Sequence, residues 1–244
     1  MRIVAVIPAY NEAPTIREVA TRTLRLVPDV IVVNDGSTDA TAAALQGLPI
    51  TIISNPVNYG KGASLWRGFA LAMADGADAV ITLDGDAQHD PEDIPRLIDA
   101  AHAHPDRIII GARLWDREKV PPLRYLGNRF ANFWVAWAAG FPVADSQSGF
   151  RLYPASVLRE VQLFHGPNAR FAFESEILIE AGRAGVRSAA VPIAALYPPD
   201  ARPSYYRSTV DTARIVRMIA WKLLSRGFDL PALVRSLSLA RRGI

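Results

Sequence analysis

The 244-residue sequence contains no cysteine, which excludes a disulfide framework and a zinc site built on thiolates. Long hydrophobic runs are also missing. The longest, residues 130–143, is interrupted by Asn132, Gly140 and Pro142 and falls short of the roughly 20 apolar residues that span a bilayer. The apolar stretch 1–8 is too short for a signal peptide, and we expect a strand there. These absences are consistent with a reducing compartment and with a chain that does not cross a membrane.

Three common phosphate-binding loops are absent as well. No G-x-G-x-x-G follows the first expected strand, which argues against a dinucleotide-binding Rossmann site. The sequence around Lys61 (Gly-Lys-Gly) lacks both the upstream glycine and the Ser/Thr of a Walker loop. The glycine-rich loop of a sugar-nucleotide pyrophosphorylase is replaced by residues 8–12, PAYNE.

Charge is distributed unevenly along the chain. The formal net charge is +3, but residues 201–244 contain nine cations and two anions, so they carry +7 and the rest of the chain carries −4. Such a basic segment favours an anionic partner, namely a membrane surface, nucleic acid or substrate phosphates; alternatively it is a solvated helix face. No recognised nucleic-acid-binding module is present, and we expect no nucleic-acid partner.

The hydrophobic pattern predicts an α/β fold. Short, almost continuous apolar strands alternate with helices, which is typical of a mostly parallel sheet covered on both faces. We expect strands at residues 3–8, 30–33, 50–53, 79–83, 107–110 and 187–193. We expect helices at residues 14–26, 37–45, 63–74, 91–102, 123–139, 154–161, 173–184 and 208–225. On the last of these helices, Val210, Ala213, Val216, Ala220 and Leu223 share one apolar face.

The sequence DGDAQHD, residues 84–90, follows the expected strand 79–83 directly. The end of that strand therefore carries two carboxylates, Asp84 and Asp86, at the edge of the sheet where ligands of open α/β sheets bind. Two carboxylates with the amide of Gln88 nearby suit Mg²⁺ or Mn²⁺ held together with substrate phosphates. The alternative is a surface turn in which Asp90 caps the helix that follows.

Five motifs in order extend this interpretation: IPAYNE (residues 7–12), VNDGSTD (33–39), NYGKGAS (58–64), DGDAQHDPEDIP (84–95) and DSQSGFR (145–151). Together they resemble an inverting family 2 glycosyltransferase, in the branch of the polyprenyl- and dolichyl-phosphate mannose or glucose synthases. The resemblance covers about residues 3–195. It implies a GT-A fold, a Rossmann-like, mostly parallel sheet in a single domain with C-terminal amphipathic helices.

The resemblance also implies a division of labour along the chain. Residues 1–200 would form the GT-A domain, with a nucleotide-binding half at about 1–112 and an acceptor half at about 113–200. Residues 201–244 would form a basic helical C-terminal segment. This segment, which contains Trp221, could lie at a membrane interface, and so could the aromatic stretch 123–141.

Carried over by motif, the resemblance assigns residues to three parts of a site. The donor nucleotide-sugar would contact Pro8, Tyr10, Glu12, Val33, Asp35, Lys61 and Asp84, and a Mg²⁺ or Mn²⁺ ion would be held by Asp84, Asp86 and Gln88. Asp86, Asp145, Arg113 and Arg151 would act at the reacting centre. The acceptor would meet Gln147, Ser148 and Glu174, with Arg202 and Arg207 in place of a basic stretch that the polyprenyl-phosphate mannose synthases carry after the last strand. Non-functional alternatives remain for several of these residues. They are loop packing for Pro8 and Tyr10, solvated Lys61 and Arg113, an Arg151–Asp145 structural ion pair, and Glu174 and Glu176 as ordinary helix-start carboxylates.

The expected reaction moves a hexose from a UDP- or GDP-linked sugar to a polyprenyl phosphate, at the cytoplasmic, inner face of a membrane. A phosphate acceptor is already anionic and needs no strong base, whereas a hydroxyl acceptor on a glycolipid requires one, and Asp145 or Glu174 would then serve. The sequence shows no clean separate base, which slightly favours the phosphate. A third possibility is a non-catalytic nucleotide-sugar-binding protein, because fold alone does not fix function.

Overall fold

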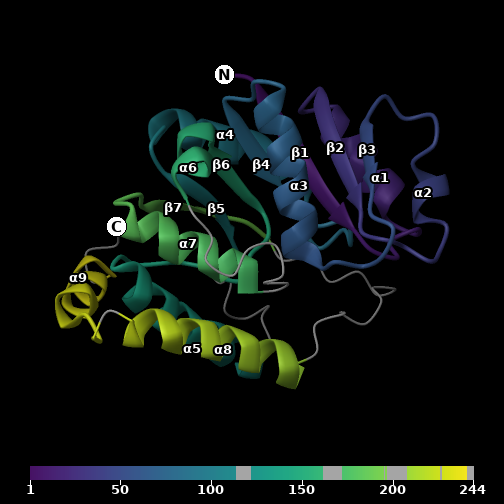
Figure 1. Ribbon diagram of the computed structural model, residues 1–244. Helices are drawn as coiled ribbons and strands as arrows, with labels where there is room; N and C mark the ends of the chain where they lie inside the picture. The colour runs from purple at the N-terminus through teal and green to yellow at the C-terminus, as the bar shows by residue number, and fades with distance from the viewer. Residues whose placement is uncertain (114–121, 162–171, 195, 197–207, 226, 241–244) are drawn as a thin grey trace.

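The computed structural model describes residues 1–113, 122–161, 172–194, 196, 208–225 and 227–240 (Figure 1). Its centre is a seven-stranded sheet in the order β3-β2-β1-β4-β6-β5-β7. The strands are β1 (Ile3–Ala9), β2 (Asp29–Asn34), β3 (Thr51–Ser54), β4 (Ala79–Thr82), β5 (Ile108–Ala112), β6 (Arg151–Pro154) and β7 (Ser188–Pro192). All described pairings are parallel except those of β6, which is antiparallel to both β4 and β5. The predicted mostly parallel α/β sheet is thus confirmed.

Strand β6 is the one described strand that the sequence pattern did not predict. It has only four residues, Arg-Leu-Tyr-Pro, and follows directly on the polar DSQSGF segment. Four residues that are buried on both faces show no alternation, and a terminal proline is typical of a turn or a helix start. We therefore expected a helix from residue 154, whereas the strand ends there and α6 (Ala155–Glu160) follows.

The helices cover both faces of the sheet. They are α1 (Ile16–Leu24), α2 (Thr41–Ala44), α3 (Lys61–Ala74), α4 (Ile94–Ala103), α5 (Pro122–Ala139), α6, α7 (Phe173–Arg183), α8 (Ser208–Leu224) and α9 (Leu230–Ala240). A 3-10 turn, Pro91–Asp93, precedes α4, and Asp90 caps it by accepting a hydrogen bond from the Glu92 amide at 3.2 Å. The capping role that the sequence allowed for Asp90 is therefore present.

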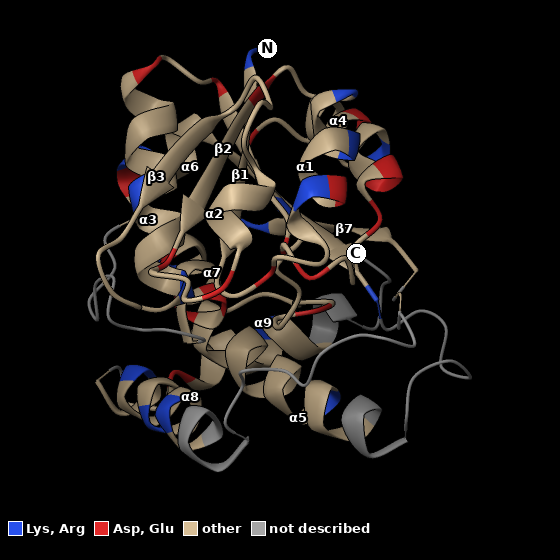
Figure 2. Ribbon diagram, turned by 90° about the vertical axis from the view of Figure 1, so that its right-hand side faces the viewer, with Lys and Arg blue, Asp and Glu red and all other residues tan. Residues whose placement is uncertain are grey.

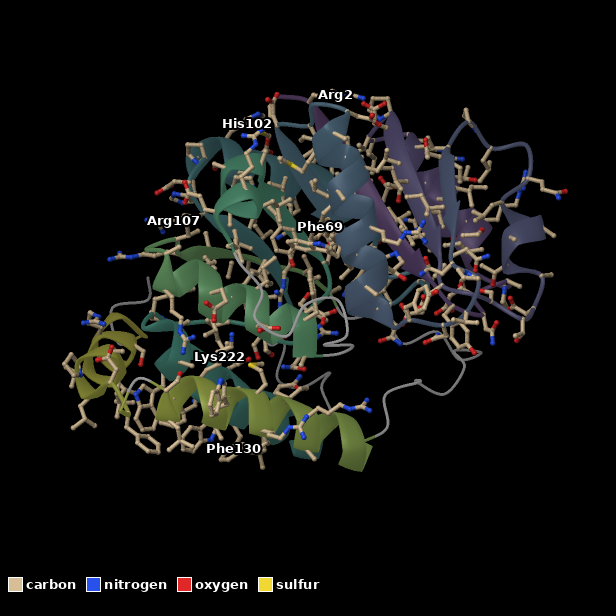
Figure 3. All side chains as sticks on the ribbon, in the orientation of Figure 1. Arg2, Phe69, His102, Arg107, Phe130 and Lys222 are labelled. Carbon is tan, nitrogen blue, oxygen red and sulfur yellow. The ribbon has the colours of Figure 1, made fainter. Side chains whose placement is uncertain are left out.

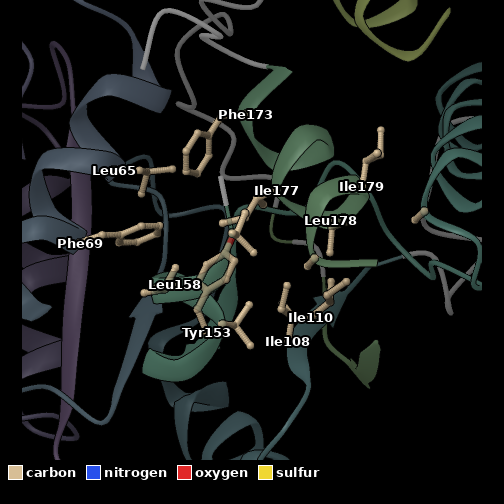
Figure 4. Close-up of a cluster of buried hydrophobic side chains, with 14 of the residues drawn as sticks. Leu65, Phe69, Ile108, Ile110, Tyr153, Leu158, Phe173, Ile177, Leu178 and Ile179 are labelled. Carbon is tan, nitrogen blue, oxygen red and sulfur yellow. The ribbon is translucent and has the colours of Figure 1, made fainter. Parts of the chain in front are cut away.

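Two hydrophobic cores explain why the central strands are apolar throughout. Successive side chains of a strand point to opposite faces, so Val4 and Val6 enter the core under α3 and α7, while Ala5 and Ile7 enter the core under α1 and α4. Figure 4 shows part of the first core, where Phe69 of α3 lies 5.3 Å from the ring of Tyr153 on β6. This packing fixes the strand ends that carry the polar residues.

The C-terminal helices form a separate layer. α5 packs against α7, α8 and α9, and the three helices α5, α8 and α9 lie together below the sheet in Figure 1. The side of α8 that packs inward contains Ile215, Met218, Ile219 and Leu223, whereas Val216, on the face that the sequence singled out, is 53% exposed. None of the helices in the described part of the chain is long and apolar enough to cross a bilayer.

Candidate active site

The candidate site lies where β1, β2 and β4 end. Because neighbouring parallel strands present their carboxyl ends at one edge of the sheet, the segments that follow them converge there. Figure 2 shows acidic stretches of the chain gathered along this lower edge, above the α5–α9 layer. The sequence motifs around residues 10, 35 and 84 are therefore brought together as expected.

A lysine joins the two halves of the site. The Nζ atom of Lys61, the first residue of α3, lies 2.5 Å from Oδ1 of Asp84 and 2.7 Å from Oε1 of Glu174. Asp84 follows β4 and Glu174 lies in the first turn of α7, so one ammonium group links the donor-side turn to the acceptor-side helix. The sequence placed Lys61 and Asp84 on the nucleotide side and Glu174 on the acceptor side, without predicting this contact.

The charge states follow from these contacts. Burial raises the pKa of Asp84, but the nearby Lys61 ammonium outweighs it and lowers that pKa to about 2. Burial alone would lower the pKa of Lys61, yet the two carboxylates raise it above its ordinary value. Burial lowers the pKa of His89 to about 4, so this ring is neutral near pH 7. The site therefore holds a charged Asp84–Lys61 pair, with Glu174 in contact with the same ammonium, beside a neutral imidazole.

Gly149 closes over the ion pair. A Cβ atom built on this glycine would lie 2.6 Å from Lys61 Nζ and 2.8 Å from Asp84 Oδ2, distances that real Cβ atoms essentially never show. The backbone there is fixed, because the Thr82 hydroxyl donates a hydrogen bond to the Gly149 carbonyl at 2.7 Å. Only glycine fits this position while Lys61 and Asp84 stay where they are. This role of Gly149 was not predicted from the sequence, although the glycine stands within the last motif, DSQSGFR.

Asp35 holds the loop that leads to Lys61. Its carboxylate accepts hydrogen bonds from Asn55 Nδ2 at 2.7 Å and from the amides of Tyr59 at 2.9 Å and Gly60 at 2.8 Å. Gly60 has a φ of +97°, which favours glycine immediately before α3 begins. Asp35 is buried, and its three hydrogen bonds hold the 55–60 loop in place in addition to any contact with a nucleotide base.

The donor-side residues of the first motif occupy different environments. Pro8 is buried in β1 opposite Val33 of β2, and the Val33 side chain lies in the hydrophobic core. Tyr10 is half-buried at the end of β1. Glu12 is buried, and its amide donates to the Thr41 hydroxyl at 2.8 Å. Pro8 and Val33 can thus shape a donor pocket through the backbone and their packing, while Tyr10 and Glu12 supply polar groups.

The residues predicted to bind a metal ion lie in the turn after β4. The backbone N–H of Gln88 donates a hydrogen bond to Asp86 Oδ1 at 3.1 Å, and Ala87 between the two residues has a φ of +60°. No group of three or more His, Asp or Glu side chains in the described ranges forms a preassembled cage for an ion. A Mg²⁺ ion needs no such cage when phosphates complete its shell, and the oxygen donors of Asp84, Asp86 and Gln88 fit that chemistry.

On the acceptor side, Asp145 pairs with Arg113. Oδ2 of Asp145 accepts hydrogen bonds from Arg113 Nε at 3.0 Å and from the Arg113 backbone N–H at 3.2 Å. Oδ1 of Asp145 accepts a hydrogen bond from the backbone N–H of Gln147 at 3.1 Å. Burial raises the pKa of Asp145, but the Arg113 guanidinium and these donors lower it below its ordinary value. The alternative that Asp145 pairs with Arg151 is wrong.

Arg151 lies deeper than the sequence predicted. It is fully buried, and its guanidinium donates to the carbonyls of Glu174 at 2.6 Å and Ser146 at 2.9 Å. These bonds tie the segment 145–150 to the first turn of α7. We therefore treat Arg151 as a residue that positions the acceptor-side wall through main-chain contacts.

The other residues predicted for the acceptor side lie in different surroundings. Gln147 donates from Nε2 to the hydroxyls of Ser146 and Ser175, each at 3.2 Å, and Ser148 is buried with its hydroxyl accepting from the Phe150 amide at 3.3 Å. Sequence reasoning missed Asn132 of α5, whose side chain donates to the Ala144 carbonyl at 2.7 Å and accepts from the Ser146 amide at 2.8 Å. Arg202 and Arg207 lie outside the described residues.

Comparison with known proteins places the chain in a family. Residues 4–162 match the model of the family described as "Glycosyl transferase family 2". The undecaprenyl-phosphate mannosyltransferase of Micrococcus luteus is 27% identical over 208 residues, covering 79% of this chain and 83% of that protein. The UDP-N-acetylglucosamine–dolichyl-phosphate N-acetylglucosaminyltransferase of Methanococcus voltae is 29% identical, covering 80% of this chain and 86% of that protein.

Solved structures agree on the fold. Glucosyl-3-phosphoglycerate synthase from Mycobacterium tuberculosis, crystallised with Mn²⁺, UDP and product, superposes with a TM-score of 0.61 at 23% identity, covering 92% of this chain and 79% of that one. Mannosyl-3-phosphoglycerate synthase from Rubrobacter xylanophilus gives a TM-score of 0.70 at 17% identity, covering 93% and 75%. The resemblance read from the five motifs is confirmed: the chain belongs to glycosyl transferase family 2, is a glycosyltransferase and has a GT-A fold.

Proposed function

We propose that the protein transfers a hexose from a nucleoside-diphosphate sugar to a polyprenyl-phosphate acceptor, with inversion at the anomeric carbon and with the help of Mg²⁺ or Mn²⁺. The observation that carries the choice of acceptor is that both candidate bases are engaged in ion pairs. Asp145 is held by Arg113, and Glu174 is held by Lys61. A carboxylate that neutralises a fixed cation is a poor proton acceptor, whereas a phosphate acceptor needs none.

The reaction then requires only alignment and charge stabilisation. A lone pair on an acceptor phosphate oxygen forms the new bond to the anomeric carbon, the bond from that carbon to the diphosphate oxygen breaks, and the nucleoside diphosphate leaves with the electron pair. The transition state resembles an oxocarbenium ion, as in other glycosyl transfers. A bound Mg²⁺ or Mn²⁺ ion would neutralise the charge on the leaving diphosphate. Structures of other GT-A proteins containing Mn²⁺ or Mg²⁺ support this use of a metal.

The residues of this chain have complementary tasks in the proposal. Asp84 and Asp86 would hold the ion, with Gln88 beside them. Lys61 keeps Asp84 ionised and orients it. Arg113, fixed by Asp145 at the edge of the site, would face the phosphate of the acceptor, because a guanidinium suits phosphate geometry.

We further propose that the α5–α8–α9 layer meets the membrane as a peripheral surface. It exposes apolar side chains, among them Phe130 (63% exposed), Trp221, Leu230 and Val234. An aromatic row runs along α5 from Phe130 towards Phe228, with ring centroids of successive neighbours 5.3–6.3 Å apart, and Phe130 points away from the sheet in Figure 3. The three helices contain six cations, of which Lys222 is buried, and one anion. Aromatic side chains with adjacent cations favour the interface of an anionic leaflet.

Flotation with lipid vesicles tests this surface. The double substitution Phe130→Glu/Val234→Glu should release the protein from vesicles that mix phosphatidylcholine with phosphatidylglycerol. Ile52→Glu, at an exposed position of the edge strand β3 far from this layer in Figure 1, is the matched control and should bind as the unmodified chain does. Equal binding by the double variant and the control would reject the surface.

The reaction itself is tested with a panel of labelled UDP- and GDP-sugars, polyprenyl phosphate and Mn²⁺, with and without a chelator. The proposal expects chelator-sensitive label in the organic phase from one donor. Free sugar without labelled lipid would instead support a hydroxyl acceptor. Nucleotide-sugar binding without transfer or hydrolysis would support a binding protein.

The hydroxyl alternative makes its own prediction for the two carboxylates. With a phosphate acceptor, Asp145→Asn and Glu174→Gln should leave the pH profile of kcat unchanged, because neither carboxylate then acts as the base. Loss of a true general base should instead lower kcat by about 10²–10⁴-fold and remove the ionisation of that base from the pH profile.

A further inference from the structure

A buried ion cluster lies away from the site, between α7 and α8. Lys222 of α8 is only 3% exposed, and its Nζ lies 3.0 Å from Glu176 Oε1 and 2.6 Å from Glu180 Oε1 on α7. Arg183, in the last turn of α7, pairs with Glu180 at 2.9 Å and donates to the Lys222 carbonyl at 2.7 Å. Figure 3 shows Lys222 between the two helices. Glu176 is fully buried, and Lys222 brings a positive charge directly against it.

The same helix reaches the site at its N-terminal end. In its first turn Glu174 meets Lys61 at 2.7 Å, its carbonyl accepts from Arg151 at 2.6 Å, and Ser175 accepts from Gln147 at 3.2 Å. Residues two apart on a helix point in nearly opposite directions, so Glu174 faces the site while Glu176 faces α8. α7 is buried from Phe173 to Ile179, so a shift of its first turn changes both the contact of Glu174 with Lys61 and the contact of Glu176 with Lys222.

We infer that Lys222 is a positioning residue for the transferase: by fixing α7 through Glu176 and Glu180, it places Glu174 against Lys61 and hence sets the geometry of Asp84. The C-terminal segment, although far along the chain, is then part of the site's scaffold. The kinetic part of this inference rests on the proposed function. The structural part does not, because it concerns only the arrangement of α7.

Three variants separate positioning from simple stability. Lys222→Met removes the lysine charge and leaves the cluster with one excess negative charge beside the buried Glu176, which should destabilise the fold. The double variant Lys222→Met/Glu176→Gln removes that negative charge as well, keeps the Arg183–Glu180 pair and should recover stability, because a buried ion pair can often be replaced by neutral groups. Lys222→Arg keeps the cation. Arg159→Met, at an exposed position on α6, is the control.

The expected result is that Lys222→Met and the double variant both lose about tenfold or more in kcat/KM with a short, water-soluble isoprenyl phosphate, since a 1 Å misplacement can cost about a hundredfold. The nucleoside-diphosphate Kd measured in chelator should stay within about threefold, because the turns after β1 and β2 are untouched. Lys222→Arg should recover most of the activity, and Arg159→Met should behave as the unmodified chain. A double variant that recovers stability and full activity together would overturn the inference.

A second readout does not depend on turnover. Hydrogen exchange of amides in 172–180 and 145–151 should accelerate in Lys222→Met and in the double variant, and not in Lys222→Arg. If the unmodified chain transfers sugar to no acceptor, the proposed function fails while these exchange data still decide the inference. Unchanged exchange in both charge-removing variants would reject it.

Discussion

Gly149→Ala is a small change with a large expected consequence. The added methyl would lie 2.6 Å from Lys61 Nζ and 2.8 and 2.9 Å from the two Asp84 carboxylate oxygens. Ordinary van der Waals contact begins at about 3.4 Å, so the Lys61 ammonium and the Asp84 carboxylate must each move away from residue 149 by several tenths of an ångström. The backbone of residue 149 cannot easily yield, because Thr82 holds its carbonyl.

We expect this variant to lose about 1–3 kcal/mol of unfolding free energy, as overpacked sites do. Its kcat/KM for the donor should fall by about 10²-fold, because misplacing a charged group by up to 1 Å has costs of that order. Urea denaturation and steady-state kinetics measure the two effects. Gly127→Ala is the control, since a Cβ atom at that helical glycine meets nothing within 4 Å. Activity of Gly149→Ala within twofold of the unmodified chain would refute the reasoning.

Three further predictions concern stability and pH. The pKa of His89 is about 4 in the folded chain against the ordinary 6.5, so the unfolded chain binds more protons between these pH values. The unfolding free energy, measured in chelator, should therefore fall by about 3 kcal/mol as the pH drops from 6.5 to 4. His89→Asn should flatten this pH dependence, and an unchanged dependence in that variant would contradict the assignment to His89. Asp35→Ala strands the amides of Tyr59 and Gly60 and should cost about 2–4 kcal/mol in urea denaturation while raising KM for the donor; an unchanged KM would show that the 55–60 loop does not depend on Asp35. Arg151→Lys cannot bond both the Ser146 and Glu174 carbonyls with the same geometry and should cost about 2–4 kcal/mol, with nucleotide binding preserved; strongly weakened nucleotide binding in a folded variant would speak against a positioning role.

The parallel core of the fold was predictable from sequence because its physical signal is local. Apolar strands buried on both faces read as continuous runs, and Asp84 and Asp86 stand directly after one of them. The donor-side motifs were predictable for the same reason, since they occupy the turns after β1, β2 and β4.

The contacts that organise the acceptor side were not predictable, because they join residues distant in sequence. No short-range sequence pattern indicates that Lys61 forms an ion pair with Glu174, or that Asp145 pairs with Arg113 and not with Arg151. β6 was missed because four residues show no periodicity. Lys222 appeared to belong to a solvated basic segment, whereas α7 buries it.

The most direct test of the central claim compares two acceptors that differ in one group. Polyprenyl phosphate and the corresponding polyprenol are offered at equal concentration with the same labelled donor and Mn²⁺, and label in the organic phase is counted. With Asp145 and Glu174 both held in ion pairs, the account predicts labelled lipid from the phosphate and none above background from the alcohol. Comparable transfer to the polyprenol would contradict it.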